Sequence, residues 1–322
     1  MISLAARKAA LRQHPAAGKR EWTGRRSRRL LDFRMDTFLE VCRCGNYTRA
    51  AEKLNITQPA VTQHIQHLQN YYGVRLFIYK NKQLTLTAEG ELLRRTALTM
   101  RHDEEKLKRD MQDLKAGRRS VRFGATLTIG EYLLPARVAN YMMRNPSVSI
   151  QMVVHDTKTL LHMLNDGQLD FAVVEGYFHK SEYDHILWSH EPYICVCGPG
   201  YLLPAGPLHL RDLFSHRLIL RNDGSGTRDV LVKSLEGMNH HLSDFQHITE
   251  VSDLFAIKEL VKRDCGLTFL YRKAVEQELA DGSVRQVELA DFQVSHEFNF
   301  LWRKGSVFEA EFRQIFLELS SN

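Results

Sequence analysis

The sequence lacks any long apolar run. A helix that crosses a bilayer needs about 20 consecutive apolar residues, and the 322-residue chain contains no such stretch. Residues 1–34 also lack the apolar core of about 7–15 residues that marks a secretory signal. We therefore expect a cytoplasmic protein that has no membrane partner.

Cysteine is scarce. The five cysteines form no regular framework, which disfavours a secreted scaffold held by disulfides. Cys42 with Cys44 and Cys195 with Cys197 form Cys-x-Cys pairs, but structural zinc sites need four ligands and usually space their cysteines more widely. We expect small buried side chains, with no metal site and no cofactor. Cys265 is left as a candidate redox-sensing thiol, although no resolving thiol lies near it in sequence.

Most of the chain lacks a net positive charge, although the net charge of the whole sequence is +6. Residues 1–34 hold ten Lys and Arg against two acidic residues, so residues 35–322 sum to −2. The overall basicity is therefore weak support for nucleic-acid binding. Residues 1–34 show little apolar periodicity and are interpreted as a disordered basic arm or as the result of a mis-set start. Met35 begins the first periodic segment and favours the mis-set start.

Three short helices are predicted after this extension. The first should end at Gly45, and Thr48 should cap a second helix over residues 49–54. Thr57 should cap a third helix, which has a proline in its first turn. That third helix buries one apolar stripe, formed by Val61, Ile65, Leu68 and Tyr72.

Polar side chains occupy the exposed start of the third helix. A helix-turn-helix needs a second helix that is free to enter the major groove, where Gln and Thr can bond base edges. The candidate DNA-binding residues there are Thr57, Gln58, Pro59, Ala60, Thr62 and Gln63. Strands over 76–79 and 83–86 should form a wing that places Lys80 and Lys82 near phosphates. The alternative is a packing module with solvated faces, but the order of helices and basic hairpin favours a winged helix-turn-helix.

A helix of about 40 Å is predicted over residues 88–116. Apolar positions recur along it at steps of four and three, with one polar interruption, as in a heptad seam. The seam consists of Leu93, Ala97, Met100, Glu104, Leu107, Met111 and Leu114. So long a helix needs a packing partner. We expect a second copy of the chain, with packing against the same chain as the alternative, and a hinge over residues 117–120.

Strands and helices alternate from residue 121 onward, which is typical of an α/β fold with mainly parallel sheets. The expected strands are 121–125, 148–154, 169–174, 193–197, 218–221, 247–251, 268–271 and 298–302. A break rich in Pro and Gly at 198–207 suggests two lobes.

Two strand-to-helix loops offer hydroxyl groups, one in each predicted lobe. Such loops lie at the carboxyl ends of strands, where open α/β sheets bind ligands, and free N–H groups at helix starts favour anions. We expect a small anionic effector at a set comprising Thr126, Thr128, Thr157, Ser225, Thr227 and Arg228. Simple helix capping is the alternative for each loop, and hydroxyls could also serve a neutral ligand.

Residues 35–92 resemble the DNA-binding region of LysR-type transcriptional regulators. The matching stretches are FLEV (38–41), GNYTRAA (45–51), LNITQPAVT (54–62), GVRLF (73–77) and LTAEG (86–90), and GATLTIGEYLLP (124–135) resembles the start of the family's effector domain. The resemblance implies a homodimer or homotetramer, a two-lobed effector domain like periplasmic binding proteins, and no catalysis. Gln63, His64, His67 and Gln69 depart from the family's more usual charged residues, so base preference cannot be carried over.

The predicted organisation is an extension over 1–34, a winged helix-turn-helix over 35–86, a linker helix with a hinge over 87–119, and an effector domain over 120–322. We predict a transcriptional regulator that binds double-stranded DNA under the control of a small molecule. The competing class is a solute-binding protein with no DNA role, which the helix-turn-helix and the missing export signal disfavour. The sequence has no nucleophile elbow and no glycine-rich phosphate loop, so we expect no enzyme activity.

Overall fold

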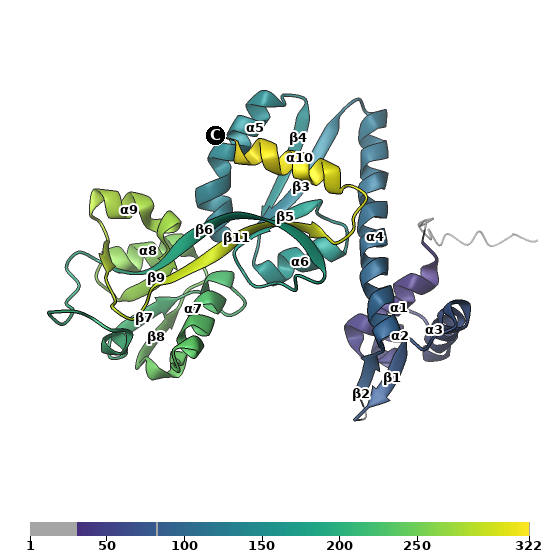
Figure 1. Cartoon of the computed structure of the whole chain (residues 1–322), viewed down its shortest axis with the longest axis horizontal. Helices are drawn as coiled ribbons and strands as arrows, with labels where there is room; N and C mark the ends of the chain where they lie inside the picture. The colour runs from purple at the N-terminus through teal and green to yellow at the C-terminus, as the bar shows by residue number, and fades with distance from the viewer. Residues whose placement is uncertain (1–30, 82, 322) are drawn as a thin grey trace, which may run out of the picture. The chain divides into compact units, whose positions relative to one another are not determined.

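The computed structural model describes residues 31–81 and 83–321, and its elements are drawn in Figure 1. Within these residues, no helix is both long enough and apolar enough to cross a membrane. The elements form an N-terminal helical module, one long helix and an α/β region. Residues 1–30 of the extension predicted over 1–34 lie outside the described residues.

The N-terminal module packs three helices and a hairpin around one small core. Its elements are α1 (Phe33–Cys44), α2 (Tyr47–Leu54), α3 (Gln58–Tyr72), β1 (Phe77–Lys80) and β2 (Gln83–Leu86). Phe38 of α1, Ala50 of α2 and Val61 of α3 are completely buried in this core. The predicted stripe of α3 is confirmed at Val61, Ile65 and Leu68, whereas Tyr72 is half exposed.

The first helix begins earlier than predicted. Asp32 caps α1 by accepting a hydrogen bond from the backbone N–H of Arg34 at 2.9 Å, and its carboxylate also pairs with the Arg34 guanidinium at 2.8 Å. Phe33 lies edge-on against the ring of His64, with 5.0 Å between the centroids. The prediction that the fold begins at Met35 is therefore wrong for residues 32–34, because a local cap and a ring contact extend the helix.

The other caps agree with the sequence except at α2. Gly45 ends α1 in the left-handed region, and Thr57 caps α3, as predicted. Asn46, not Thr48, caps α2, because its side-chain oxygen accepts from the N–H groups of Thr48 and Arg49 at 2.8 and 3.1 Å. The prediction for Thr48 is wrong because Asn46 satisfies two of the free donors at the helix start.

The long helix α4 (Ala88–Lys115) follows the hairpin, as predicted. Thr87 caps it by accepting from the N–H of Gly90 at 2.9 Å. A Cβ atom on Gly90 would lie 2.1 Å from the carbonyl oxygen of Leu76, so only glycine allows this approach. The first turn of α4 is thereby packed directly on the residue that precedes the wing.

The α/β region contains, among the described residues, one mixed sheet in the order β4-β3-β5-β11-β6-β9-β7-β8, with β10 paired to β6. The strands of the first lobe are β3 (Arg119–Ala125), β4 (Val148–Val154) and β5 (Phe171–Val174). Those of the second lobe are β7 (Arg217–Leu220), β8 (His247–Glu250), β9 (Leu267–Tyr271) and β10 (Arg285–Val287). Two long strands, β6 (Tyr183–Cys197) and β11 (Val294–Arg303), run antiparallel between the lobes.

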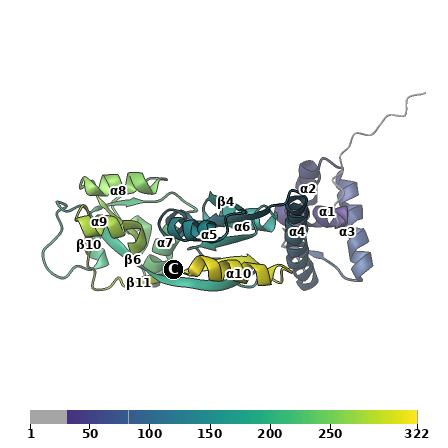
Figure 2. The same cartoon turned by 90° about the horizontal axis from the view of Figure 1, so that it is seen from above.

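Helices cover the sheet in both lobes (Figures 1 and 2). The first lobe carries a π-helical turn (Ile129–Leu133), α5 (Leu134–Arg144), α6 (Thr157–Asn165) and α10 (Glu309–Ser320). The second carries α7 (Gly226–Gly237), α8 (Leu254–Lys262), α9 (Glu276–Asp281) and three short 3-10 turns (Leu210–Leu213, Leu242–Asp244 and Arg272–Val275). The predicted alternation of strands and helices is confirmed. The prediction of a mainly parallel sheet is wrong, because β6 and β11 pair antiparallel with each other and with their neighbours β9, β10 and β5.

The boundary between the lobes differs from the prediction. The break at residues 198–207 follows β6 inside the second lobe, whereas β6 and β11 themselves carry the chain from one lobe to the other. Residues 183–192 of β6 were missed because polar residues and Pro192 interrupt their apolar pattern. The predicted hinge is also too long, because Arg119 and Ser120 belong to β3 and pair with β4.

Candidate DNA-binding surface and effector cleft

The recognition face predicted on α3 is exposed. Thr57, Gln58, Pro59, Thr62 and Gln63 are exposed, and Ala60 is half buried. A shallow groove of about 670 Å³ follows this face and is lined by Gln58, Pro59, Thr62, Gln63, Gln66, His67 and Asn70. The structure thus extends the polar face by one further turn beyond the residues that the sequence singled out.

Two residues of this face are linked to each other. The side-chain amide of Gln58 donates to the Thr62 hydroxyl at 3.0 Å, and that hydroxyl donates to the Gln58 carbonyl at 3.2 Å. The pair is exposed, so both groups can exchange these bonds for contacts with a partner.

Two of the departures from the family pattern have structural partners. The side-chain oxygen of Gln69 accepts from the N–H of Leu76 at 2.9 Å, which ties the end of α3 to the start of the wing. His64 Nδ1 and the hydroxyl of Thr37 on α1 lie 2.9 Å apart. Both side chains therefore serve the packing of the module, while His67 stays on the exposed face.

The wing is short, and its described tip is exposed. Lys80 ends β1 with an exposed side chain, and Asn81 follows in the left-handed region with φ of 51°. Lys82, the second predicted phosphate contact, lies outside the described residues. Lys80 is placed as the prediction requires, at the end of a two-stranded hairpin.

The long helix is fastened to the first lobe by charged side chains. Arg109 of α4 pairs with Asp170 at 2.6 Å, and the Asp170 carboxylate also accepts from the N–H of Arg122 at 2.8 Å. His102 is fully buried, with Nε2 lying 3.0 Å from the Leu169 carbonyl oxygen. These contacts bind α4 to the segment that leads into β5.

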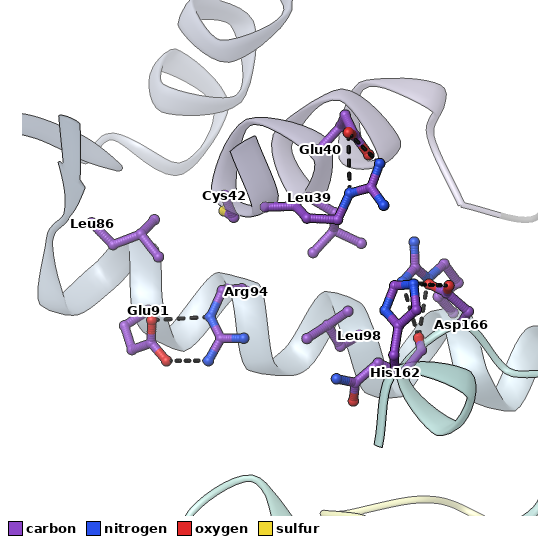
Figure 3. Close-up of a pocket in the computed structure, with 12 residues that line it drawn as sticks. Leu39, Glu40, Cys42, Leu86, Glu91, Arg94, Leu98, His162 and Asp166 are labelled. Carbon is purple, nitrogen blue, oxygen red and sulfur yellow. Dashed lines mark hydrogen bonds and ion pairs between the residues drawn. The ribbon is translucent and has the colours of Figure 1, made fainter. Parts of the chain in front are cut away.

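A polar cavity of about 640 Å³ lies where α1, α4 and α6 meet (Figure 3). The arginines that line it already have carboxylate partners. The pairs are Arg43–Glu40 at 2.7 Å, Arg94–Glu91 and Arg94–Glu182 at 2.6 Å, and Arg101–Asp166 at 2.6 Å. Because these charges are compensated within the chain, the cavity offers an anion little beyond what the chain already satisfies.

The predicted seam of α4 divides into two parts. Leu93 and Ala97 pack on the N-terminal module, and Glu104 is buried. The other four positions carry exposed apolar side chains: Met100 (51%), Leu107 (40%), Met111 (62%) and Leu114 (78%). Packing against the same chain therefore accounts for the start of the seam, and its later part is an apolar stripe open to another molecule.

A cavity of about 290 Å³ lies between the lobes. Of the predicted effector residues, Thr126 and Ser225 line it directly. Thr128, Thr157 and Thr227 are buried beside it, where the Thr227 hydroxyl donates to Glu175 at 2.9 Å. The structure thus brings together hydroxyls from both predicted loops.

Glu175 is at the centre of this group, although no sequence motif singles it out. It follows β5 and is only 2% exposed. Burial raises the pKa of its carboxyl to about 7, opposed by the Thr227 hydrogen bond and the charge of Arg221. The hydroxyls of Thr126 and Thr128 also oppose the rise, although Thr126 Oγ1 makes no hydrogen bond of normal geometry.

The cleft has a different arginine from the predicted one. Arg228 points to Glu250, which it pairs with at 2.6 Å, and to the carbonyl of Arg221 at 3.3 Å. Arg221 itself follows β7 and lines the cavity, and burial lowers the pKa of its guanidinium. No motif surrounds Arg221 in the sequence, so only its position at the end of a strand could have suggested it.

The five cysteines are all unpaired. Cys195 and Cys197 are buried, and Cys42 and Cys44 are half buried, in line with their interpretation as small core side chains. Burial raises the pKa of Cys42 to about 12. Cys265 is exposed. Across residues 31–81 and 83–321, no three His, Cys, Asp or Glu side chains converge as metal ligands would.

Two protein-family models match the chain. The one described as "Bacterial regulatory helix-turn-helix protein, lysR family" matches residues 34–91, and "LysR substrate binding domain" matches residues 115–319. The second match alone covers more than half of the chain.

Curated relatives match over most of their length. The protein described as "Uncharacterized HTH-type transcriptional regulator YeiE" of Escherichia coli K12 is 29% identical over 253 residues, which cover 79% of this chain and 84% of that protein. CysL of Bacillus subtilis, also an HTH-type transcriptional regulator, is 26% identical over 272 residues, which cover 83% and 89%.

Solved structures share the fold. A hydrogen-peroxide-bound OxyR mutant of Corynebacterium glutamicum has a TM-score of 0.56 at 24% identity, covering 89% of this chain and 91% of that one. LysG of the same organism, with bound effector Arg, has a TM-score of 0.56 at 15% identity, covering 89% and 97%. The two-lobed α/β fold with an N-terminal helix-turn-helix is therefore that of known regulators.

Proposed function

This chain belongs to the LysR family of transcriptional regulators, and we propose a separate role for each part of this effector-modulated DNA-binding regulator. Residues 35–86 bind DNA, residues 87–119 link and pair two copies, and residues 120–322 receive the effector. The alternative of a solute-binding protein with no DNA role is not favoured, because the helix-turn-helix model matches residues 34–91.

The exposed polar face of α3 recognises the bases of the operator. Gln58, Pro59, Thr62 and Gln63 contact bases, and Thr57 and Ala60 belong to the same DNA-binding surface. Gln and Thr side chains on one exposed helix face support this assignment. Lys80 and Lys82 of the wing contact phosphates, which add affinity without sequence preference.

The regulator works as a homodimer or homotetramer. Support comes from the apolar stripe on α4, formed by Met100, Leu107, Met111 and Leu114. Exposed apolar side chains at heptad spacing are stabilised when a second helix covers them. Two paired chains would present two recognition helices to two half-sites of one operator.

The effector binds between the lobes, against Thr126, Thr128, Thr157, Ser225 and Thr227. This site is supported above all by the hydroxyl groups that both lobes place around one cavity. Arg221 replaces Arg228 as the charged contact, because Arg228 is already paired with Glu250. A ligand that touches both lobes shifts their arrangement only by binding one arrangement more tightly.

We assign no catalysis and a cytoplasmic location to this regulator. Its family consists of transcription regulators, and a cytoplasmic location agrees with a role in binding DNA.

The purified full-length protein tests this function directly. Fragmented genomic DNA retained by the protein is sequenced with and without a library of small metabolites. We expect a shared palindromic motif whose recovery changes with at least one metabolite. Retention without any enriched motif contradicts the proposed DNA role, and a motif that no metabolite affects contradicts the effector role.

A further inference from the structure

The cavity between the lobes exposes polar groups that the described residues do not satisfy. Glu175 Oε2, Thr126 Oγ1, Thr157 Oγ1 and Arg221 Nε are all buried without a hydrogen-bond partner. Buried polar atoms in folded proteins nearly always have partners. Thr126, Glu175 and Arg221 line this cavity and come from both lobes, and Thr157 is buried beside it. Unsatisfied atoms gathered in this way indicate a site built for a polar ligand rather than a packing fault.

The unsatisfied groups need complementary partners. When Glu175 is ionised, its carboxylate can only accept hydrogen bonds, so Oε2 then needs a donor. The guanidinium of Arg221 can only donate, and its buried Nε has no hydrogen-bond partner within the described residues, so it needs an acceptor. The two threonine hydroxyls can serve either kind of group. A matching ligand carries a strong donor and a strong acceptor.

The charge of the cavity disfavours a simple anion. Its lining contains the carboxylates of Asp156, Glu175, Asp223 and Asp253 against the guanidinium of Arg221 and the imidazole of His155. Asp156 and Asp253 cap α6 and α8, so their oxygens are partly used by backbone N–H groups. Their charges nevertheless remain, and a ligand with only negative groups would meet an excess of like charge.

We propose that the effector is a small ampholyte of the α-amino-acid class, with its ammonium group on Glu175 and its carboxylate on Arg221. This rests on the proposed function, since it concerns the same cleft. The ammonium group supplies the missing donor to a buried carboxylate, and a carboxylate matches the guanidinium fork. The cavity volume of about 290 Å³ lies at the lower end of the range for small-molecule sites, which suits a molecule of that size.

The two groups lie on different lobes, which explains how such a ligand would act. Glu175 follows β5 in the first lobe, and Arg221 follows β7 in the second. The Thr227 hydroxyl of the second lobe already donates to Glu175. An amino acid that bridges both charges favours the arrangement in which the lobes meet, whereas a ligand with one charge holds one lobe only.

Thermal unfolding and calorimetry of the full-length protein test this assignment. The probes are the twenty protein amino acids at millimolar concentration. The best binder is then compared with two analogues of the same side chain, the hydroxy acid without the amine and the amine without the carboxylate. The variants are Glu175→Gln and Arg221→Gln, with Glu276→Gln on the exposed face of α9 as the matched control.

We expect at least one amino acid to raise the unfolding midpoint, and each analogue to bind about tenfold or more weakly, as the loss of a charged hydrogen bond predicts. Glu175→Gln should weaken the amino acid by a similar factor and leave the hydroxy acid unaffected. Arg221→Gln should weaken both, and Glu276→Gln neither.

Three results would overturn the assignment. The first is that no amino acid raises the midpoint. The second is that the hydroxy acid binds as tightly as the amino acid in a manner that depends on Arg221, which rejects the ampholyte but keeps the cleft as the effector site. The third is that a ligand which alters operator binding ignores both substitutions, which removes the cleft from the proposed function as well.

Discussion

At the scale of single residues, Glu175 joins deep burial to an incomplete set of partners. Burial raises its pKa to about 7, well above the value of about 4.3 for an exposed Glu in an unfolded chain. Between these two pH values, Glu175 therefore keeps its proton in the folded protein and loses it in the unfolded chain. In the absence of ligand, the ionised Glu175 carboxylate lowers the free energy of unfolding. This loss of stability disappears as the pH falls and the carboxyl becomes protonated.

We predict that Glu175→Gln stabilises the ligand-free protein above about pH 8, by up to about 3 kcal/mol, and has little effect below about pH 4.5. The measurement is the free energy of urea unfolding of both proteins across this range. Comparing the two proteins isolates the contribution of residue 175 from those of the other charged side chains that line the same cavity, which are His155, Asp156, Asp223 and Asp253. A stability difference that does not change with pH contradicts the prediction.

The exposed polar face of α3 is expected to determine base preference. Gln63→Ala should change base preference at one operator position by about 1–3 kcal/mol, because a good side-chain contact to a base edge is worth that much. Binding to a library of operator variants measures the change. Gln112→Ala on α4, which is also exposed, is the matched control. An unaltered preference in Gln63→Ala would remove this residue from base recognition.

At the scale of elements, α4 connects both functional parts. One face packs on the N-terminal module, and a second is tied to the first lobe through Arg101, His102 and Arg109. The turn after it is also held, because the carboxylate of Asp113 accepts hydrogen bonds from Ser120 and Arg118. We therefore expect α4 to move together with the first lobe, because the turn between them is held by these hydrogen bonds and does not act as a free hinge.

The third face of α4 leads to a prediction about assembly. Glu replacements at Met100 and Leu107 place charges on the apolar stripe, so we expect monomers in analytical ultracentrifugation. Operator affinity should fall about a hundredfold or more, since the second half-site no longer binds as part of one molecule. Leu202→Glu, at a loop position that is 86% exposed, should leave both properties unchanged. A dimer of normal affinity in the double variant would contradict the proposed pairing.

At the scale of the whole molecule, the basic N-terminal stretch should affect affinity but not specificity. A chain that begins at Leu31 keeps the Asp32 cap, whereas one that begins at Met35 loses it and should be about 1 kcal/mol less stable. Both should fold and keep the operator preference of the full chain. Both should also bind random DNA more weakly and with a smaller salt dependence, because they lack basic residues of the extension.

Urea unfolding and titrations of specific and random DNA at several salt concentrations measure these effects. Equal stability of the two shortened chains would show that the Asp32 cap contributes nothing. A changed operator preference would show that the extension takes part in recognition.

The sequence by itself determined the features that depend on neighbouring residues. Gly45 and Gly73 end helices, Thr57 and Thr87 start them, and the spacing of apolar residues sets the buried face of α3. Such signals are local, because a cap or a stripe is made within a few turns. They predicted the winged helix-turn-helix, the long helix and the α/β alternation. The misassigned cap of α2 shows their limit, since two residues could fill that position.

Only the tertiary structure decided what meets at the effector cleft. Thr126, Thr157, Glu175, Arg221 and Thr227 lie on separate segments, and they converge only when β6 and β11 bring the lobes together. The structure also decided which arginine is available, because Arg228 is held by Glu250 across a distance that no sequence pattern reports. Burial, and with it the raised pKa of Glu175, is a property of everything packed around that carboxylate, so it cannot be inferred from its neighbours in the chain.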